Sequence, residues 1–369
     1  MIAELAVTDG PLISAEVLAP VIRKHVDPAA PLPIRTMGAK LLVPTSPHDA
    51  VCMLYLLSFD PDEGIRNQAL ASADALPDRL SLTGLRDDAV PPMVLTWWAD
   101  RVAENDKLAE LVVLNQATPD HAIANIARRA SPRIAELVSQ NQLRLLRDEG
   151  ILRALLVESR ISPAIRDNVA DFAIRSGIYL GDVPALVESH RRIHGDVPPL
   201  DPGDTADDLL AEFAAELAMD EEDADAPIEE KRKATLTQRV MNMSVSQKIK
   251  LATLGNKEAR GILLRDTNKL VCVAAASSPR ITEGEILMLT NSRTVHEDVL
   301  RVIYTDRDWL KIYQVKLNLV RNPKTPLPTA LRFLPHVRPN ELKDLKDNRN
   351  VPQAVRTAAR NLMLKTKKT

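Results

Sequence analysis

A five-residue phrase that occurs twice, about 200 residues apart, constrains the fold of this chain more than any other feature. It reads Asn115-Gln116-Ala117-Thr118-Pro119 and Asn322-Pro323-Lys324-Thr325-Pro326, and each copy separates two apolar runs. Asn can end a helix in the left-handed conformation. Thr then caps the next helix, and Pro occupies its first turn, where no backbone donor is lost. The phrase therefore predicts a helix, a tight corner and a second helix at both places.

The composition indicates an all-α protein. Apolar residues make up 45% of the 369 positions, which is enough for a packed core, and the length allows two or three domains. Aromatic residues are only 3%, and 26 prolines outnumber 12 glycines, as is typical of closely packed helices whose starts are marked by proline. No Asn-Gly or Asp-Gly hairpin turn lies between alternating runs, so signals for strands are nearly absent.

Apolar periodicity and Pro- or Asp-marked starts predict many short helices. They fall into an N-terminal lobe, residues 1–197, and a C-terminal lobe, residues 237–369, joined by a Pro- and acid-rich linker, residues 198–236. In the N-terminal lobe the predicted helices are 15–26, 48–58, 62–73, 91–104, 107–115, 119–129, 133–141, 151–158, 163–176 and 183–194. In the C-terminal lobe they are 245–254, 257–264, 268–277, 283–290, 296–304, 307–321, 327–335, 339–345 and 351–366.

Internal repeats occur in both lobes. Ser131-Pro132-Arg133-Ile134 recurs as Ser278-Pro279-Arg280-Ile281, and Ser162-Pro163-Ala164-Ile165 is a near copy. With a shift of 44 residues, apolar positions of segment 271–287 coincide with those of segment 315–331. Repeats of this length predict stacked units, none of which can bury its apolar face alone.

The repeats resemble a known class of protein. The opening Asp60-Pro61-Asp62-Glu63-Gly64-Ile65-Arg66, and the Asn/Ser-Pro corners that lead into Leu-rich helices, are similar to HEAT-like repeats and to the variant leucine-rich repeat. The block from Gly255 to Pro352 also resembles uncharacterised bacterial proteins of this type. The resemblance implies an α-solenoid of short, irregular helical repeats in two lobes. It implies no particular reaction, because such folds supply surfaces and not mechanisms.

The charge is distributed unevenly, although the net value is only −2. Residues 231–369 contain 28 Lys and Arg against 11 Asp and Glu, whereas residues 1–230 contain 20 against 39. Within the acidic part, residues 201–230 carry 13 carboxylates and no base. This asymmetry predicts an acidic linker followed by a basic lobe that could attract anionic partners.

The acidic linker contains one amphipathic segment. Thr205-Ala206-Asp207-Asp208 is a capping-box-like start, and an apolar stripe follows at helical spacing. Three interpretations remain open: a surface helix on the N-terminal lobe, a helix that docks in the groove of a partner protein, or a helix that masks the basic lobe. The residues of the predicted partner-docking stripe are Leu209, Leu210, Phe213 and Leu217.

The surplus cations of the C-terminal lobe predict a surface for an anionic partner. Such a surface can bind nucleic acid through salt-dependent phosphate contacts, and the alternative is that these side chains only solvate the helices. Stacking of single-stranded bases is less favoured, because aromatic residues are few. The candidate residues are Arg307, Lys311, Lys316, Arg321, Lys324, Arg356 and Arg360.

Two further local patterns favour structural roles. His190 and His194 are four residues apart, a spacing that can bind zinc, but the order is not His-Glu-x-x-His and no third ligand is evident. A polar helix end closed by Gly195 is the preferred interpretation. In Trp97-Trp98 we expect one ring in the core and the other at the surface. We predict no metal site and no cofactor.

The remaining features concern location and function. Cys52 and Cys272 both lie in apolar runs and are expected to be buried thiols of a reducing compartment. No secretory signal or membrane-spanning run is evident, so a cytoplasmic location is expected. No phosphate-binding loop or nucleophile motif is present. The sequence therefore predicts a non-catalytic scaffold or adaptor that binds other proteins, with nucleic-acid binding through the C-terminal lobe as the alternative.

Overall fold

The computed structural model describes residues 10–158, 160–195, 205–217, 235–348 and 350–366. Within these ranges every regular element is a helix and there is no β-strand, so the prediction of an all-α protein is confirmed. The α-helices are short, from five residues in α10 (Glu149–Arg153) to 14 in α23 (Gln353–Thr366). None of the helices in the described ranges is sufficiently long and apolar to span a bilayer.

The chain forms two compact units, which are described separately. The N-terminal unit comprises Met1–Arg175 and Tyr179–Val197, and the C-terminal unit comprises Ser176–Ile178 and Pro198–Thr369. The predicted linker 198–236 is described only over residues 205–217 and 235–236, which belong to the C-terminal unit. The rest of the predicted linker lies outside the described residues.

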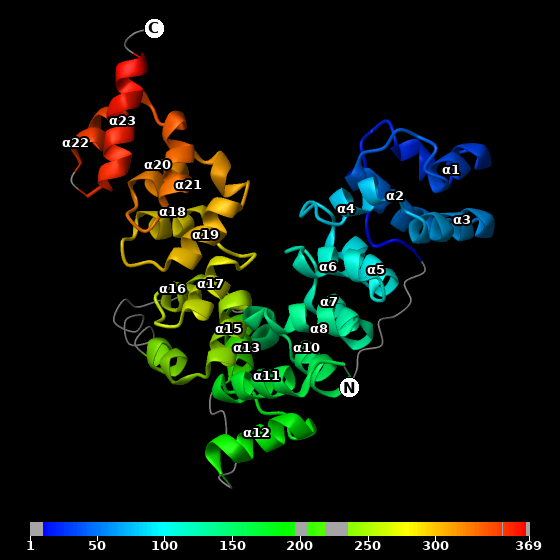
Figure 1. Ribbon diagram of the computed structural model, residues 1–369, viewed down its shortest axis with the longest axis horizontal. Coiled ribbons are helices and arrows are strands. Elements are labelled where there is room, and N and C mark those ends of the chain that lie inside the picture. The colour runs from blue at the N-terminus through cyan, green and yellow to red at the C-terminus, as the bar shows by residue number, and fades with distance from the viewer. Residues whose placement is uncertain (1–9, 159, 196–204, 218–234, 349, 367–369) are drawn as a thin grey trace. The chain divides into compact units, whose positions relative to one another are not determined.

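Figure 1 shows the helices of the N-terminal unit following one another in chain order, from the blue α1 to the green α12. They are η1 (Ala15–Val17), η2 (Arg23–His25), α1 (Leu32–Ala39), α2 (Pro47–Leu57), α3 (Glu63–Asp74), α4 (Asp78–Gly84), α5 (Pro92–Val102), α6 (Asp106–Leu114), α7 (Asp120–Arg129), α8 (Pro132–Ser139), α9 (Gln142–Arg147), α10, the π-helical turn η3 (Ala154–Glu158), α11 (Pro163–Arg175) and α12 (Pro184–His194).

The C-terminal unit is built in the same way. Its helices are α13 (Ala206–Leu217), a helical segment at residues 235–242, α15 (Val245–Leu254), α16 (Lys257–Leu263), α17 (Lys269–Ala276), α18 (Glu283–Asn291), α19 (Glu297–Thr305), η4 (Trp309–Lys311), α20 (Tyr313–Arg321), α21 (Leu327–Phe333), η5 (Leu334–His336), α22 (Pro339–Asp347) and α23. The principal contacts in both units join near neighbours along the chain, such as α5 with α7, α15 with α17, α17 with α19, and α18 with α20.

Most predicted helices are present within one or two residues of their expected bounds, but several differ. The predicted helix 15–26 is two 3-10 turns, η1 and η2, because Pro20 interrupts it. The predicted helix 307–321 is broken at Ile312, whose backbone is extended between η4 and α20. Four helices were not predicted: α1, α4, α9 and the helical segment at residues 235–242. Each has only six to eight residues, which is too short for a periodic pattern.

The core of the N-terminal unit is centred on α2. Every residue from Ala50 to Leu57 is buried, and α2 packs against α1, α3, α4 and α5. Trp98 of α5 is 1% exposed and donates its indole N–H to the carbonyl oxygen of Val51 over 3.3 Å. Gly84 permits close packing of α4, because a Cβ there would lie 2.6 Å from the carbonyl oxygen of Pro47. Burial of this kind is the main stabilising contribution to the unit.

Buried arginine–carboxylate pairs join neighbouring layers of helices. They are Arg35 with Asp60, Arg144 with Asp120, and Arg260 with Glu285, each separated by 24 or 25 residues. Arg260 donates to both carboxylate oxygens of Glu285 over 3.1 Å. Burial acts to raise the pKa of Glu285, but hydrogen bonds from Arg260 and Thr282 outweigh it and lower that pKa. The pair is therefore ionised and holds α16 against α18.

Both cysteines are free and buried, as predicted. Burial, reinforced by nearby carboxylates, raises the pKa of Cys52 to about 12 and that of Cys272 to about 11. Cys272 donates its thiol hydrogen to the carbonyl oxygen of Asp266 over 3.0 Å. Both side chains thus act as small apolar groups in the packing of helices.

Candidate interaction surfaces

The two copies of the repeated phrase form the predicted corners, but by a different mechanism. Asn115 is not left-handed; its backbone is extended, with φ −69° and ψ 126°. Its side-chain amide donates to the carbonyl oxygens of Leu85 over 2.9 Å and Asp87 over 3.1 Å. Its side-chain oxygen accepts from the backbone N–H of Ala117 over 2.9 Å. The asparagine therefore joins its own corner to the corner that ends α4.

Asn322 repeats this arrangement in the C-terminal unit. Its backbone is extended too, and its amide donates to the carbonyl oxygens of Thr290 over 2.7 Å and Ser292 over 2.8 Å. Its side-chain oxygen accepts from the backbone N–H of Lys324 over 2.9 Å. Both asparagines are buried. We call each arrangement an asparagine corner.

The predicted caps at these corners are wrong. Pro119 and Pro326 themselves occupy the cap positions of α7 and α21, and neither helix start has a side-chain cap. Thr118 instead donates its hydroxyl back to the carbonyl oxygen of Val112 over 2.6 Å. The hydroxyl oxygen of Thr325 is buried and has no hydrogen-bond partner among the described residues. In the first copy the threonine therefore binds the end of the preceding helix, α6. The capping rule had predicted that it would cap the following helix, α7.

Arg144 supports the N-terminal asparagine corner. Its guanidinium donates to the carbonyl oxygens of Thr118 over 2.7 Å and Asn115 over 3.1 Å, and to the carboxylate of Asp120 over 2.8 Å. Burial is the largest influence on Arg144 and lowers its pKa. Arg144 could not be predicted from the sequence, since its partners lie 24 to 29 positions away and no local motif marks it.

The predicted anion-binding residues do not gather in one place. Arg307 and Lys311 precede α20, whereas Arg321 is its last residue and Lys324 follows it, so the two pairs lie at opposite ends of a nine-residue helix. At 1.5 Å per residue the helix separates them by about 13 Å. Lys311 is bound to Asp308 over 2.6 Å. The seven residues therefore do not form one compact cluster.

The other three candidates lie on helices. Lys316 is half-buried on α20, and Arg356 is half-buried on α23 with a buried Nε that has no hydrogen-bond partner among the described residues. Arg360 is exposed one turn further along α23. Whether any of these residues binds an anion stays a prediction.

The amphipathic segment of the acidic linker is helix α13, and it packs on the C-terminal unit. Leu209 and Phe213 are buried and Leu210 is half-buried, while the side chain of Leu217 lies outside the described residues. The helix contacts α15. This location corresponds to the intramolecular interpretation, but masking of a basic surface and docking to a partner remain untested predictions.

Polar contacts fix α13 at three points. Glu212 accepts two hydrogen bonds of 2.8 Å from Arg239, and Asp207 binds Lys250 over 2.7 Å. The side-chain oxygen of Gln247 accepts from the first backbone N–H of the helix over 2.6 Å. The hydrogen bond from Arg239 is the largest influence on the pKa of Glu212 and lowers it. The acidic face of α13 thus neutralises bases at the start of the C-terminal unit.

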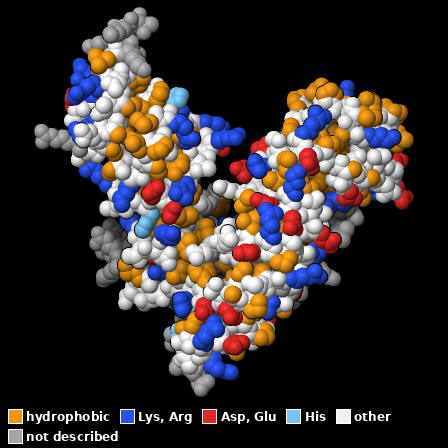
Figure 2. All heavy atoms as spheres, viewed as in Figure 1, with side chains coloured by type: hydrophobic (Ala, Val, Ile, Leu, Met, Phe, Trp, Pro, Cys, Tyr) orange, Lys and Arg blue, Asp and Glu red, His pale blue; other side chains and the backbone are white. Residues whose placement is uncertain are grey.

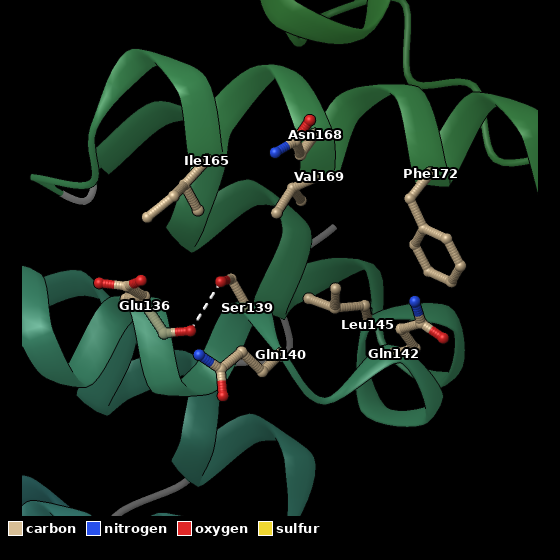
Figure 3. Close-up of a pocket in the computed structure, with 9 residues that line it drawn as sticks. All are labelled: Glu136, Ser139, Gln140, Gln142, Leu145, Ile165, Asn168, Val169 and Phe172. Carbon is tan, nitrogen blue, oxygen red and sulfur yellow. Dashed lines mark hydrogen bonds between the residues drawn. The ribbon is translucent and has the colours of Figure 1, made fainter.

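A shallow groove of about 220 Å³ crosses the N-terminal unit between α8, α9 and α11. Figure 3 shows Ile165, Val169 and Phe172 of α11 pointing toward α8 and α9 across it, with Asn168 at its edge on the same helix. The other lining residues are Glu136, Ser139, Gln140, Gln142 and Leu145. This groove could not be predicted from the sequence, because its amide side chains come from the end of α8, from α9 and from α11 and share no motif.

The histidine and tryptophan pairs have structural positions. His190 and His194 have ring centres 5.0 Å apart, and Gly195, at φ +70°, ends the helix as predicted. No group of His, Cys, Asp and Glu in the described ranges could hold a metal ion. Trp98 is in the core, and Trp97 is half-buried beneath the guanidinium of Arg101, so the division of roles predicted for the two rings is confirmed.

Comparison of this chain with models of protein families, with characterised proteins and with solved structures finds no match.

Proposed function

We propose that this protein is a non-catalytic scaffold, built as two α-solenoid lobes, that presents helical surfaces to other proteins. The observation that carries the proposal is the asparagine corner, which recurs in both units and joins each corner to the one about 30 residues earlier. Contacts between alternate helices, such as α5 with α7 and α17 with α19, support the same layered architecture. Layered helices expose long surfaces, and such surfaces typically serve recognition.

The groove between α8, α9 and α11 is the surface that we assign to a protein partner. Its amides, from Gln140, Gln142 and Asn168, each offer a donor and an acceptor. The backbone of an extended peptide presents the same two groups in alternation. Ile165 and Phe172 add apolar area beside them. The groove therefore suits an extended peptide segment.

Asn168→Trp tests this function, since Asn168 is exposed and a tryptophan there would fill the groove. The full chain and the variant are immobilised, exposed to lysate, and compared by mass spectrometry of the retained proteins. The control is Gln116→Trp, which replaces another exposed amide away from the groove. We expect the first variant alone to lose specific proteins. Identical sets retained by all three forms, or none retained above background, would refute the scaffold proposal.

Binding of nucleic acid by the C-terminal unit is the second candidate. Residues 309–340 contain six Lys and Arg and no carboxylate. Over α18 to α23, the face drawn in Figure 2 carries more blue than red side chains beside a broad orange area. Such a surface attracts phosphates in a salt-dependent way. A gel-shift titration of the full chain at increasing salt tests this candidate. No shift at about 50 mM salt would eliminate it.

A further inference from the structure

We propose that Arg293, Arg321 and Lys324 form a basic ridge that binds the phosphodiester backbone of a nucleic-acid duplex. This inference rests on the second candidate function and names the surface that would perform it. The ridge lies on two adjacent corners of the C-terminal unit, one after α18 and one after α20. It differs from the predicted set, because it adds Arg293 and keeps only Arg321 and Lys324 of the seven predicted residues.

The C-terminal asparagine corner holds the two corners of the ridge together. The amide of Asn322 donates to the carbonyl oxygen of Ser292, which immediately precedes Arg293. The oxygen of the same amide accepts from the backbone N–H of Lys324. The backbone next to Arg293 and the backbone of Lys324 are thus bound to the nitrogen and the oxygen of one buried amide group. Arg321 is the last residue of α20 and directly precedes that asparagine.

The three cations are available to a ligand. Arg293 and Lys324 are exposed, Arg321 is half-buried, and none of them forms an ion pair within the described part of the chain. The nearest carboxylates in sequence are Glu297 and Asp298, in the first turn of α19. Asp298 is already approached by Lys269 over 3.9 Å and by Arg301 over 3.8 Å.

Arg265 is a further cation beside α18, the helix that leads to Arg293. It is exposed after α16, and its guanidinium nitrogen lies 3.8 Å from the sulfur of Met288 on α18. Two hydroxyl side chains, Ser292 and Thr294, lie in the same corner as Arg293 and are 3.2 Å apart. Hydroxyl groups and arginines are among the usual protein ligands of nucleic-acid phosphates.

The N-terminal asparagine corner shows that the corner itself does not require cations. It has the same hydrogen bonds, yet Leu114 and Ala117 stand where the C-terminal corner has Arg321 and Lys324. The adjoining corner has Asp88 where the C-terminal unit has Arg293. Carbonyl groups at helix ends favour cations. Because both copies have such ends and only one has the cations, this preference does not account for the ridge.

A duplex fits the ridge better than the other anionic partners. An acidic peptide would need an apolar anchor at the centre of its site. The side chains around Arg293 are Asn291, Ser292 and Thr294, which are polar. Single strands are held largely by stacking on aromatic rings, and none occurs in segments 291–295 or 321–325. A row of cations without such partners suits the regular phosphates of a duplex, with no reading of base sequence.

The test exchanges the ridge for the residues of the N-terminal copy. The variant Arg293→Asp, Arg321→Leu, Lys324→Ala keeps Asn322 and uses side chains that an asparagine corner of this chain already accommodates. The control variant Lys257→Ala, Arg307→Asp, Lys311→Ala makes the same change in net charge. Its residues lie at the start of α16 and before the start of α20, away from the corners that carry the ridge. Binding of the full chain to labelled duplex DNA and duplex RNA of equal length is measured by fluorescence anisotropy across salt concentrations.

The expected result is a change in salt dependence. Each phosphate contact contributes about −0.9 to the slope of log affinity against log salt for DNA, so the ridge variant should have a slope shallower by about 2.7. The ratio of wild-type affinity to variant affinity should therefore fall about 40-fold as the salt concentration rises from about 50 to 200 mM. The control variant should retain most of the wild-type slope. Tighter binding of either duplex supports the ridge and identifies the source of the phosphates.

Other outcomes overturn specific parts of the proposal. Equal losses in the two variants would mean that net charge alone drives binding, which refutes the ridge but leaves nucleic-acid binding intact. No binding by the wild-type chain would remove both. Displacement of the duplex by poly-glutamate at equal charge concentration would assign the ridge to acidic proteins. If the triple variant does not fold, the single variant Lys324→Glu, at an exposed position, is compared with wild type in the same binding assay.

Discussion

Asn115→Ala should destabilise the N-terminal unit far more than a surface asparagine does. The side chain is 3% exposed and makes three hydrogen bonds, of 2.9, 3.1 and 2.9 Å, to backbone groups of two corners. A typical hydrogen bond contributes about 0.5–1.5 kcal/mol, and each buried group left unsatisfied costs about 1–3 kcal/mol. The carbonyl groups at a corner can recover part of this through water. We therefore expect a loss of about 2–4 kcal/mol in the free energy of unfolding.

The assay is urea unfolding followed by tryptophan fluorescence. Trp97 and Trp98 both lie on α5 of the same unit, and Trp309 of the C-terminal unit is replaced by Phe in all forms, so that the signal reports the transition of interest. The expected loss corresponds to a decrease in Tm of about 6–12 °C for a unit of this size. The matched control is Asn125→Ala on α7, where the side chain makes exposed contacts with Asp100 and Arg128. That change should stay within about 0.5 kcal/mol of wild type.

Asn115→Asp adds a second comparison at the same position. The carboxylate can still accept from Ala117, but it presents an oxygen to two carbonyl oxygens where the amide presents a donor. It should therefore be at least as destabilising as alanine at neutral pH. If Asn115→Ala is no more destabilising than Asn125→Ala, the buried amide is not what joins the two corners, and the reasoning fails.

Three further predictions concern other parts of the fold. Burial raises the thiol pKa of Cys52 to about 12 and that of Cys272 to about 11. Both cysteines should therefore resist a thiol reagent at mildly alkaline pH and react only on unfolding. Rapid reaction of the native protein would contradict their burial. Arg260→Ala should cost about 3–5 kcal/mol in thermal unfolding, because it leaves the Glu285 carboxylate buried without its partner. Since the folded-state pKa of Glu285 is lowered from 4.5, the pair contributes stability above that pH, and the cost should shrink as the pH falls below it. Leu209→Asp should raise hydrogen exchange in α13 without affecting α18 to α20, whereas Leu210→Asp, at a half-buried position, should have a smaller effect.

Local patterns were sufficient to predict the class of fold and most helix positions. Serine, aspartate, asparagine or threonine side chains cap several helices, as at Ser46, Asp62, Asn256 and Thr282, and these signals lie within three residues of the group they bind. The positions of the two corners were predicted correctly, but the conformation of the asparagine and the role of the threonine were not. The hydrogen-bond partners that decide the conformation of Asn115 are 28 and 30 residues away, beyond the reach of any capping rule.

The candidate surfaces were less predictable for the same reason. The stripe of Leu209 and Phe213 has one pattern whether it packs on its own chain or on another protein, and only the structure places it against α15. Linear spacing also grouped Arg307 with Arg321, although Arg307 precedes α20 and Arg321 is its last residue. Arg293 stood alone in the sequence, and only the hydrogen bonds of Asn322 bring its corner beside that of Lys324.

The two asparagine corners separate what builds the fold from what can give it a ligand. Every hydrogen bond that the buried amides make is to a backbone group, so these hydrogen bonds do not depend on the side chains at the neighbouring positions. In the N-terminal unit those positions hold Leu114, Ala117 and Asp88, and in the C-terminal unit they hold three cations. Exchange of these side chains should therefore leave the free energy of unfolding within about 0.5 kcal/mol of wild type while it changes binding. A large loss of stability in the exchanged variant would mean that the corner depends on its exposed side chains after all.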